Sequence, residues 1–301
     1  MENGCDNNTR QTALSFNSTA IPGNVIAMEN HILSIGGGNM GSAIIGGLLA
    51  KDYRADRIAV VDPSTQVQTK IADDFGISVQ ATCREIRDGE IVLLAVKPQI
   101  MQPVVKELAQ LISTQRPLFI SIAAGITTTQ LRRWLKADVP IVRVMPNTPS
   151  LVGHGAAALF ATAEVRDDER RFAESIMSAV GLAQWVDDEA LLDVVTALSG
   201  SGPAYFFLFM EIMEEVAVEL GLERSIARKL TIETAHGAAL LAQNSAFAPG
   251  ELREQVTSPG GTTERALGIL NSGDIRGLLR EALKGAHSRS NELAIAADTD
   301  L

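Results

Sequence analysis

Hydrophobic residues follow one kind of pattern before about residue 188 and another after it. In the first part, short runs of consecutive apolar residues alternate with stretches in which apolar residues recur every three or four positions. The apolar runs predict strands at 31–35, 57–61, 91–96, 118–123 and 141–145. The stretches between them predict helices at about 40–51, 64–75, 99–112 and 127–136. Apolar strands joined by helices are typical of a parallel sheet covered on both faces.

The second part of the chain shows only the helical period. The strand pattern stops after Asp187, and we expect helices at 189–220, 224–245, 249–256 and 263–296. The sequence therefore predicts a parallel α/β domain followed by an all-α domain, with the boundary between residues 188 and 189.

Two stretches of the chain bear on targeting and membrane insertion: the first 28 residues and the most apolar stretch elsewhere. Residues 1–28 are rich in Asn, Ser and Thr, and they lack the basic start and apolar run of a secretory signal. We expect a flexible tail there, and Met28 is a hypothetical alternative start. The most apolar stretch elsewhere, 197–210, is shorter than the roughly 20 residues of a membrane span. Gly200, Gly202 and Pro203 interrupt it, so we expect a buried helix and no membrane partner.

Composition narrows the functional classes. The 301 residues are 46% hydrophobic and 21% charged, as in a globular chain of two ordinary domains. The formal charge of −10 and 4% aromatic content argue against a nucleic-acid partner. Two cysteines cannot build a disulfide scaffold, and the four histidines show no metal-ligand spacing. We expect no metal and a reducing, cytoplasmic location.

A glycine-rich loop follows the first predicted strand. It fits the dinucleotide fingerprint G-x-G-x-x-G, with Gly36, Gly37, Gly38, Asn39, Met40 and Gly41. Glycines permit the tight turn and let backbone N–H groups approach a pyrophosphate at the positive end of the next helix. Asp62 ends the second strand, where the fingerprint expects an acid. The first domain is therefore predicted to be a Rossmann domain that binds NADPH or NADH.

The choice between the two cofactors stays open at this point. The Asp62 carboxylate would accept hydrogen bonds from the ribose 2′-hydroxyl of NADH and repel the 2′-phosphate of NADPH. Alternatively, Asp62, Pro63 and Ser64 cap the following helix.

Three further strand ends carry small residues and prolines. They are the segments 95–99 (AVKPQ), 121–125 (SIAAG) and 145–149 (MPNTP). Ligands of open parallel sheets sit outside the carboxyl ends of the strands, so we expect a rigid floor for a flat ring here.

Two segments of the second domain complete a recognisable pattern. They are 199–205 (SGSGPAY) and 258–263 (SPGGTT), which follow the dinucleotide loop in this order. With them, the stretch from His31 to about Leu293 resembles the pyrroline-5-carboxylate reductase family. The resemblance implies a Rossmann domain over 29–188, a helical dimerisation and substrate domain over 189–301, and dimers that can assemble in fives into a decamer. It also implies hydride transfer from NAD(P)H to the C=N carbon of 1-pyrroline-5-carboxylate, giving proline.

Site residues can be carried over from the family position by position. The pyrophosphate falls on 36–41, and the nicotinamide side on Ala95, Val96, Lys97, Pro98, Ala123 and Ala124. The family's substrate contacts fall on Glu189, Gly261, Thr262 and Thr263. Ser201 is a further candidate contact, with close helix packing as its alternative. Asp62 and Cys83 stand where some members have a small hydroxyl residue and an asparagine near the adenosine ribose.

The chemistry of the reaction assigns a task to each of these residues. Thr263 is the catalytic candidate as hydrogen-bond partner of the ring nitrogen, although an alcohol is a poor proton donor near neutral pH. Gly261 and the next residues offer backbone N–H groups to the substrate carboxylate, and the alternative is that Thr262 or Thr263 only caps the helix. The alternative for Glu189 is a solvated helix start.

Two other functions use the same general layout. An NAD(P)-dependent 3-hydroxy acid dehydrogenase needs a general base, usually a lysine on the helix between its domains, and residues 199–211 contain none. A non-catalytic nucleotide sensor would have kept the fold without turnover. Turnover of the cyclic imine separates the three functions.

Overall fold

The computed structural model describes residues 30–299, so the predicted tail at 1–28 lies outside the described residues. The strands are β1 (Ile32–Ile35), β2 (Ile58–Val61), β3 (Val79–Gln80), β4 (Ile91–Leu94), β5 (Leu118–Ser121), β6 (Ile141–Met145), β7 (Gly155–Ala161) and β8 (Gly181–Trp185). Five helices lie among them: α1 (Asn39–Leu49), α2 (Thr65–Phe75), α3 (Pro98–Ala109), α4 (Thr128–Leu135) and α5 (Asp167–Ser178). Then come α6 (Leu191–Val195), α7 (Gly202–Glu219), α8 (Arg224–Asn244), α9 (Pro249–Gln255), α10 (Thr262–Ser272) and α11 (Ile275–Thr299).

The strands form one sheet in the order β3-β2-β1-β4-β5-β6-β7-β8. The five predicted strands are confirmed as parallel neighbours, β2-β1-β4-β5-β6. The sheet is mostly parallel rather than wholly parallel, because β7 runs antiparallel to β6, with Val144 opposite Leu159. The apolar pattern does not predict β7, because the segment GAAALFA consists mostly of small residues rather than the β-branched residues that mark strands.

Helices cover both faces of the sheet, as the continuous apolar strands predict. On one face, Ile44 and Ile45 of α1 and Phe172 of α5 pack in one apolar cluster. On the other face, Met101 of α3 and Leu131 of α4 pack in a second cluster. The fold of the first half is therefore a mostly parallel α/β domain, whose carboxyl strand ends form one edge.

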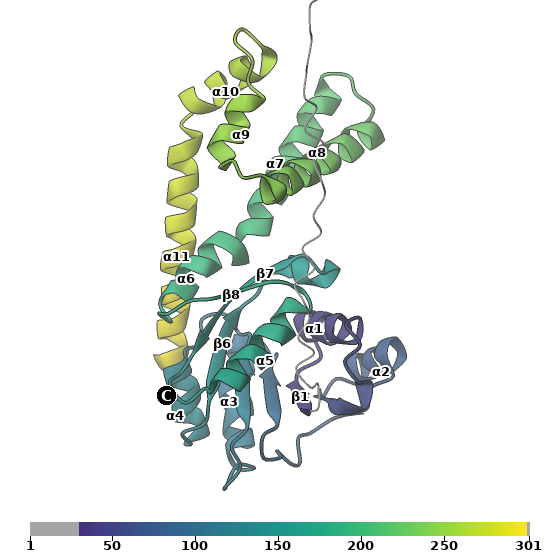
Figure 1. The fold of residues 1–301 in the computed structure, drawn as a ribbon, viewed down its shortest axis with the longest axis vertical. Coiled ribbons are helices and arrows are strands. Elements are labelled where there is room, and N and C mark those ends of the chain that lie inside the picture. The colour runs from purple at the N-terminus through teal and green to yellow at the C-terminus, as the bar shows by residue number, and fades with distance from the viewer. Residues whose placement is uncertain (1–29, 300–301) are drawn as a thin grey trace, which may run out of the picture.

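The helical half extends away from the sheet (Figure 1). The single helix expected at 189–220 is divided by a π-helical turn, η3 (Thr196–Gly200), between α6 and α7. The helix expected at 263–296 is two helices, because Asp274 adopts a left-handed conformation with φ of 53° between α10 and α11. The carboxyl-terminal part of α11 returns to the sheet domain, where the Gln130 amide of α4 donates to the Ala294 carbonyl.

The expectation of a buried helix at 197–210 is wrong for the chain by itself. Within the run Leu191–Glu219, an apolar window of 18 residues has a mean hydropathy of 1.3, and only 22% of that window is buried; by length and composition alone, the run could cross a membrane. Phe206 is 65% exposed and Leu220 is 84% exposed. An apolar surface of this extent requires a covering partner.

Candidate functional site

The glycine loop turns directly from β1 into α1, and its shape depends on absent side chains. Gly36 has a φ of +100°, and a Cβ there would lie 2.7 Å from the Ala95 carbonyl oxygen. A Cβ at Gly41 would lie 2.8 Å from the Gly36 carbonyl oxygen. Gly38 is the N-cap of α1 without a side-chain cap, and open space lies beside it. The first turn of α1 therefore presents free backbone N–H groups to an anion.

Asp62 holds this loop from the end of β2. Its Oδ2 accepts from the Gly37 N–H at 2.9 Å, and its Oδ1 accepts from the Ser64 N–H at 2.9 Å. The N-cap of α2 is Ser64 rather than Asp62. The carboxylate is thus oriented by two backbone groups at the position where the fingerprint places an acid.

The ends of β4 and β5 lie beside the glycine loop in the sheet order. The Ala95 N–H donates to the Ile35 carbonyl at 2.8 Å, and Pro98 opens α3. Ala123 is buried and Ala124 is half-buried, while the Lys97 side chain is exposed. The structure therefore brings together the predicted cofactor residues of β1, β2, β4 and β5 at one edge.

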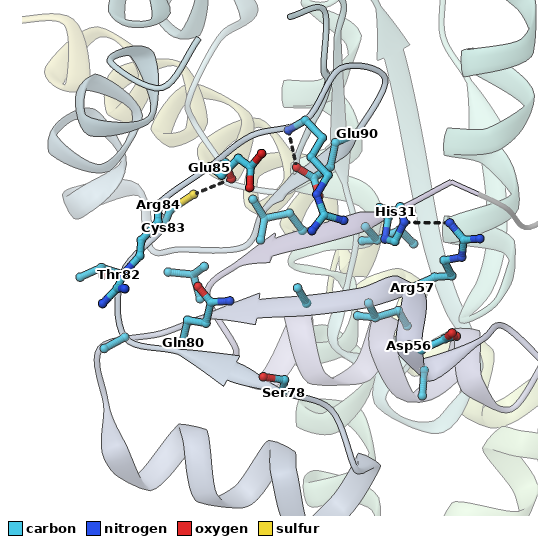
Figure 2. Close-up of a pocket in the computed structure, with 18 of the residues that line it drawn as sticks. His31, Asp56, Arg57, Ser78, Gln80, Thr82, Cys83, Arg84, Glu85 and Glu90 are labelled. Carbon is cyan, nitrogen blue, oxygen red and sulfur yellow. Dashed lines mark hydrogen bonds between the residues drawn. The ribbon is translucent and has the colours of Figure 1, made fainter.

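A groove of about 1020 Å³ runs along β1 and β2, and of the predicted cofactor residues only Cys83 lines it. Figure 2 shows Thr82 and Cys83 toward one end and the contact of His31 with Arg57 toward the other. Cys83 is half-buried, and burial raises the pKa of its thiol. The thiol is therefore neutral near pH 7, which fits a pocket wall rather than a nucleophile.

The third of these strand ends, that of β6, holds the bend between α6 and α7. The bend consists of the π-helical turn η3 and Ser201, that is, residues 196–201. Asn147 is buried, its Nδ2 donates to the Ser199 carbonyl at 3.0 Å, and its Oδ1 accepts from the Ala156 N–H at 2.8 Å. A Cβ on Gly200 would overlap the Met145 methyl group. Sequence reasoning placed Asn147 at a strand end but gave it no task.

Glu189 is engaged in a polar network, and its side chain, which is 21% exposed, also lines a small cavity beside Thr128 and Phe160. Its two oxygens accept from the Thr128 N–H at 2.8 Å and the Thr128 hydroxyl at 2.6 Å. The buried Arg143 guanidinium of β6 donates to it at 3.0 Å. Asp193 of α6 lies 3.9 Å from the same guanidinium and accepts from the Ser290 hydroxyl of α11. The arrangement gives Glu189 a structural task, and its contact with the substrate stays a prediction.

The glycine–threonine segment, residues 261–263, lies at the N-terminus of α10. Gly261 is the N-cap of α10 without a side-chain cap, so the expectation that Thr262 or Thr263 caps this helix is wrong. The Thr263 side chain is half-buried and makes no hydrogen bond to the described residues. Figure 1 shows α10 at the far end of the helical half from the sheet. Within one chain, the structure therefore does not bring Gly261, Thr262 and Thr263 to the cofactor residues.

Metal chemistry receives no support within residues 30–299. No group of three or more His, Cys, Asp and Glu side chains there could hold a metal ion.

Comparisons with known proteins match both halves of the chain. Residues 189–293 match the family described as pyrroline-5-carboxylate reductase dimerisation. Residues 31–125 match the family described as NADP oxidoreductase coenzyme F420-dependent.

Full-length relatives extend the match over nearly the whole chain. Pyrroline-5-carboxylate reductase of Pseudomonas aeruginosa is 46% identical over 264 residues, which are 87% of this chain and 96% of the relative. The pyrroline-5-carboxylate reductase of Coxiella burnetii, whose structure is solved, is 43% identical, with a TM-score of 0.83 over 88% of this chain and 98% of that one. The Plasmodium falciparum pyrroline carboxylate reductase, whose structure has NADP bound, is 26% identical with a TM-score of 0.77 over 89% and 99%.

Proposed function

This chain belongs to the pyrroline-5-carboxylate reductase family, and from that premise we propose how its own residues bind cofactor and substrate. The chain is an NAD(P)H-dependent oxidoreductase that reduces 1-pyrroline-5-carboxylate to proline. Residues 29–188 form its dinucleotide-binding domain, and 189–301 form its dimerisation and substrate domain.

The cofactor fits the edge built by β1, β2, β4 and β5. The loop 36–41 holds the pyrophosphate, since neither Gly36 nor Gly41 has room for a side chain and the start of α1 is uncapped. Asp62 faces the adenosine ribose, and Cys83 lines the groove beside it. Residues 95–98 and the pair Ala123 and Ala124 form the floor for the nicotinamide.

When bound, the reduced cofactor supplies a hydride to the imine carbon of the substrate. The protonated iminium is already electrophilic, so the protein needs little acid catalysis. Its main task is to hold the ring and the nicotinamide at reacting distance, which contributes several kcal/mol.

The uncapped first turn of α10 is the observation that carries the substrate assignment. The N–H groups that follow Gly261 have no side-chain cap, so they and the positive helix end favour the substrate carboxylate. Thr263 offers its hydroxyl to the ring nitrogen, and Thr262 stands beside it. Ser201, at the N-terminus of α7, contacts the substrate from the β6 side.

A second copy of the chain completes this site. The helical half is a dimerisation domain, and α10 lies far from the glycine loop of its own chain (Figure 1). We expect the partner to bring its α10 to the loop of the first copy. We also propose that the dimers assemble in fives, as the family resemblance implies, and that the chain is cytoplasmic, as its two cysteines suggest.

Initial rates with 1-pyrroline-5-carboxylate and either NADPH or NADH test the reaction. We expect oxidation of the cofactor with an equal amount of proline formed. Thr263→Ala should lower kcat/KM for the imine about tenfold or more while the cofactor Kd stays within twofold. Unchanged kinetics in this variant would remove Thr263 from the site. Nucleotide binding without turnover in the wild type would favour the sensor function.

A further inference from the structure

We propose that Asn147 is a positioning residue for the reduction, acting through the bend between α6 and α7 that carries Ser201. The inference rests on the substrate contact proposed above for Ser201. It is carried by the backbone hydrogen bonds that this bend lacks and by the side chains that replace them.

The first missing bond is caused by Pro203. In a regular helix, the Ser199 carbonyl would accept from the backbone N–H four residues later, but residue 203 is a proline and has none. The Asn147 amide donates to this carbonyl at 3.0 Å. One buried side chain therefore satisfies a backbone acceptor that the sequence of the bend leaves without a partner.

The second missing bond is caused by the π turn. The Ser201 N–H donates to the Thr196 carbonyl, five residues back, at 2.8 Å. The Ala197 carbonyl loses this donor, and the Tyr205 hydroxyl replaces it at 3.1 Å. The two side-chain donors lie on either side of the turn and fix its course.

Asn147 itself is held firmly. Its exposed fraction is 8%, and its Oδ1 accepts from the Ala156 N–H at the start of β7. Gly200 packs so closely on Met145 that a Cβ would overlap the methionine methyl group. The bend is thus fixed to the carboxyl end of β6, the edge at which parallel sheets bind their ligands.

Ser201 is the residue that this arrangement presents. Its side chain is half-buried and makes no hydrogen bond to the residues that the structure describes. The direction of its hydroxyl is set by the bend, because Ser201 itself donates the π-turn hydrogen bond. Loss of the Asn147 donor would let the turn relax and move this hydroxyl.

Asn147→Asp is the sharpest perturbation. It keeps the oxygen that accepts from Ala156 and replaces the donor by an oxygen that repels the Ser199 carbonyl. We expect kcat/KM for the imine to fall about 10- to 100-fold, mainly through kcat, with the cofactor Kd within twofold. Tyr205→Phe removes the other donor with little loss of volume and should give a smaller loss of the same kind.

Gln130→Glu is the matched control. Gln130 is equally buried, its Oε1 accepts from the Thr127 N–H, and its Nε2 donates to the Ala294 carbonyl. The Gln130→Glu variant therefore loses the same kind of side-chain amide donor as Asn147→Asp, at a site away from the bend. We expect lower stability with kcat/KM within twofold of the wild type.

A double-mutant cycle with Ser201→Ala tests the route. If Asn147 acts through Ser201, the double variant should be no more than about twofold worse than the poorer single variant. Multiplicative losses, a parallel change in the cofactor Kd, or an equal kinetic loss in Gln130→Glu would overturn the proposal. A defect in Asn147→Asp with normal kinetics in Ser201→Ala would instead refute the substrate contact of Ser201 and leave Asn147 as support of the bend.

Discussion

The network around Arg143 gives a prediction that separates a structural from a substrate-binding role for Glu189. The perturbation is Glu189→Gln, which keeps the shape and the acceptor for the Thr128 N–H but removes the charge beside Arg143. The Arg143 side chain is only 4% exposed, and the ion pair at 3.0 Å is its shortest charged contact. An arginine stays protonated at any accessible pH, so the variant leaves a buried charge with weaker compensation.

The expected loss of stability depends on the contacts that Arg143 keeps in the variant. Removal of one partner of a buried ion pair typically costs about 3–5 kcal/mol. Asp193, with its oxygen 3.9 Å from the Arg143 guanidinium, still offsets part of the charge, and the Gln amide oxygen still accepts a hydrogen bond. We therefore expect the free energy of unfolding to fall by about 2–3 kcal/mol.

The assay is urea unfolding at one fixed protein concentration, because a dimer's apparent stability depends on concentration. Glu164→Gln is the matched control, since its pair with Arg132 leaves both side chains about one-third exposed. Such a pair contributes about 0–1 kcal/mol. A normal stability of Glu189→Gln together with a tenfold loss of kcat/KM for the imine would refute the structural role and restore the substrate contact.

Three further predictions concern the dimer and the cofactor edge, which is the sheet edge at the carboxyl ends of β1, β2, β4 and β5. Asp62→Ser should raise the ratio of kcat/KM with NADPH to kcat/KM with NADH, because the repelling carboxylate is gone; an unchanged ratio would contradict this. Gly36→Ala should abolish detectable NAD(P)H binding by fluorescence titration, because its Cβ would meet the Ala95 carbonyl at 2.7 Å; normal affinity would refute the tight turn. Sedimentation at micromolar concentration should show no monomer, since Phe206 and its neighbours are exposed in the single chain.

The sequence predicted what depends on neighbouring residues. Gly37 of the glycine loop and Asp62 lie 25 residues apart along one β-α-β unit, and their placement follows from a local pattern that general principles describe. The strands with continuous β-branched runs were predicted for the same reason. β7 was not predicted, because alanine and glycine carry no strand preference. Its antiparallel direction is set by the return of the chain beside β6.

The tasks of Asn147 and Glu189 could not be predicted, because their partners are remote in the sequence. Asn147 meets Ser199 across 52 residues, and Glu189 meets Thr128 across 61. A glutamate at a helix start looks the same in sequence whether it faces water, substrate or a buried arginine. One clue did exist for Asn147: Pro203 leaves the Ser199 carbonyl without its helical donor, so a donor from outside the helix had to replace it.

The apolar surface of α7 and the remote position of α10 have one common explanation. A helix with Phe206 at 65% exposure needs a partner surface, and the proposed substrate segment of α10, at the far end of the molecule (Figure 1), needs a second cofactor edge. One partner copy meets both needs if the partner's α10 approaches the glycine loop of the first copy, while α7 of the first copy packs on the helices of the partner. Activity and dimerisation would then be lost together on dilution, and a substitution on the exposed face of α7 would lower both without touching any residue of the cofactor edge.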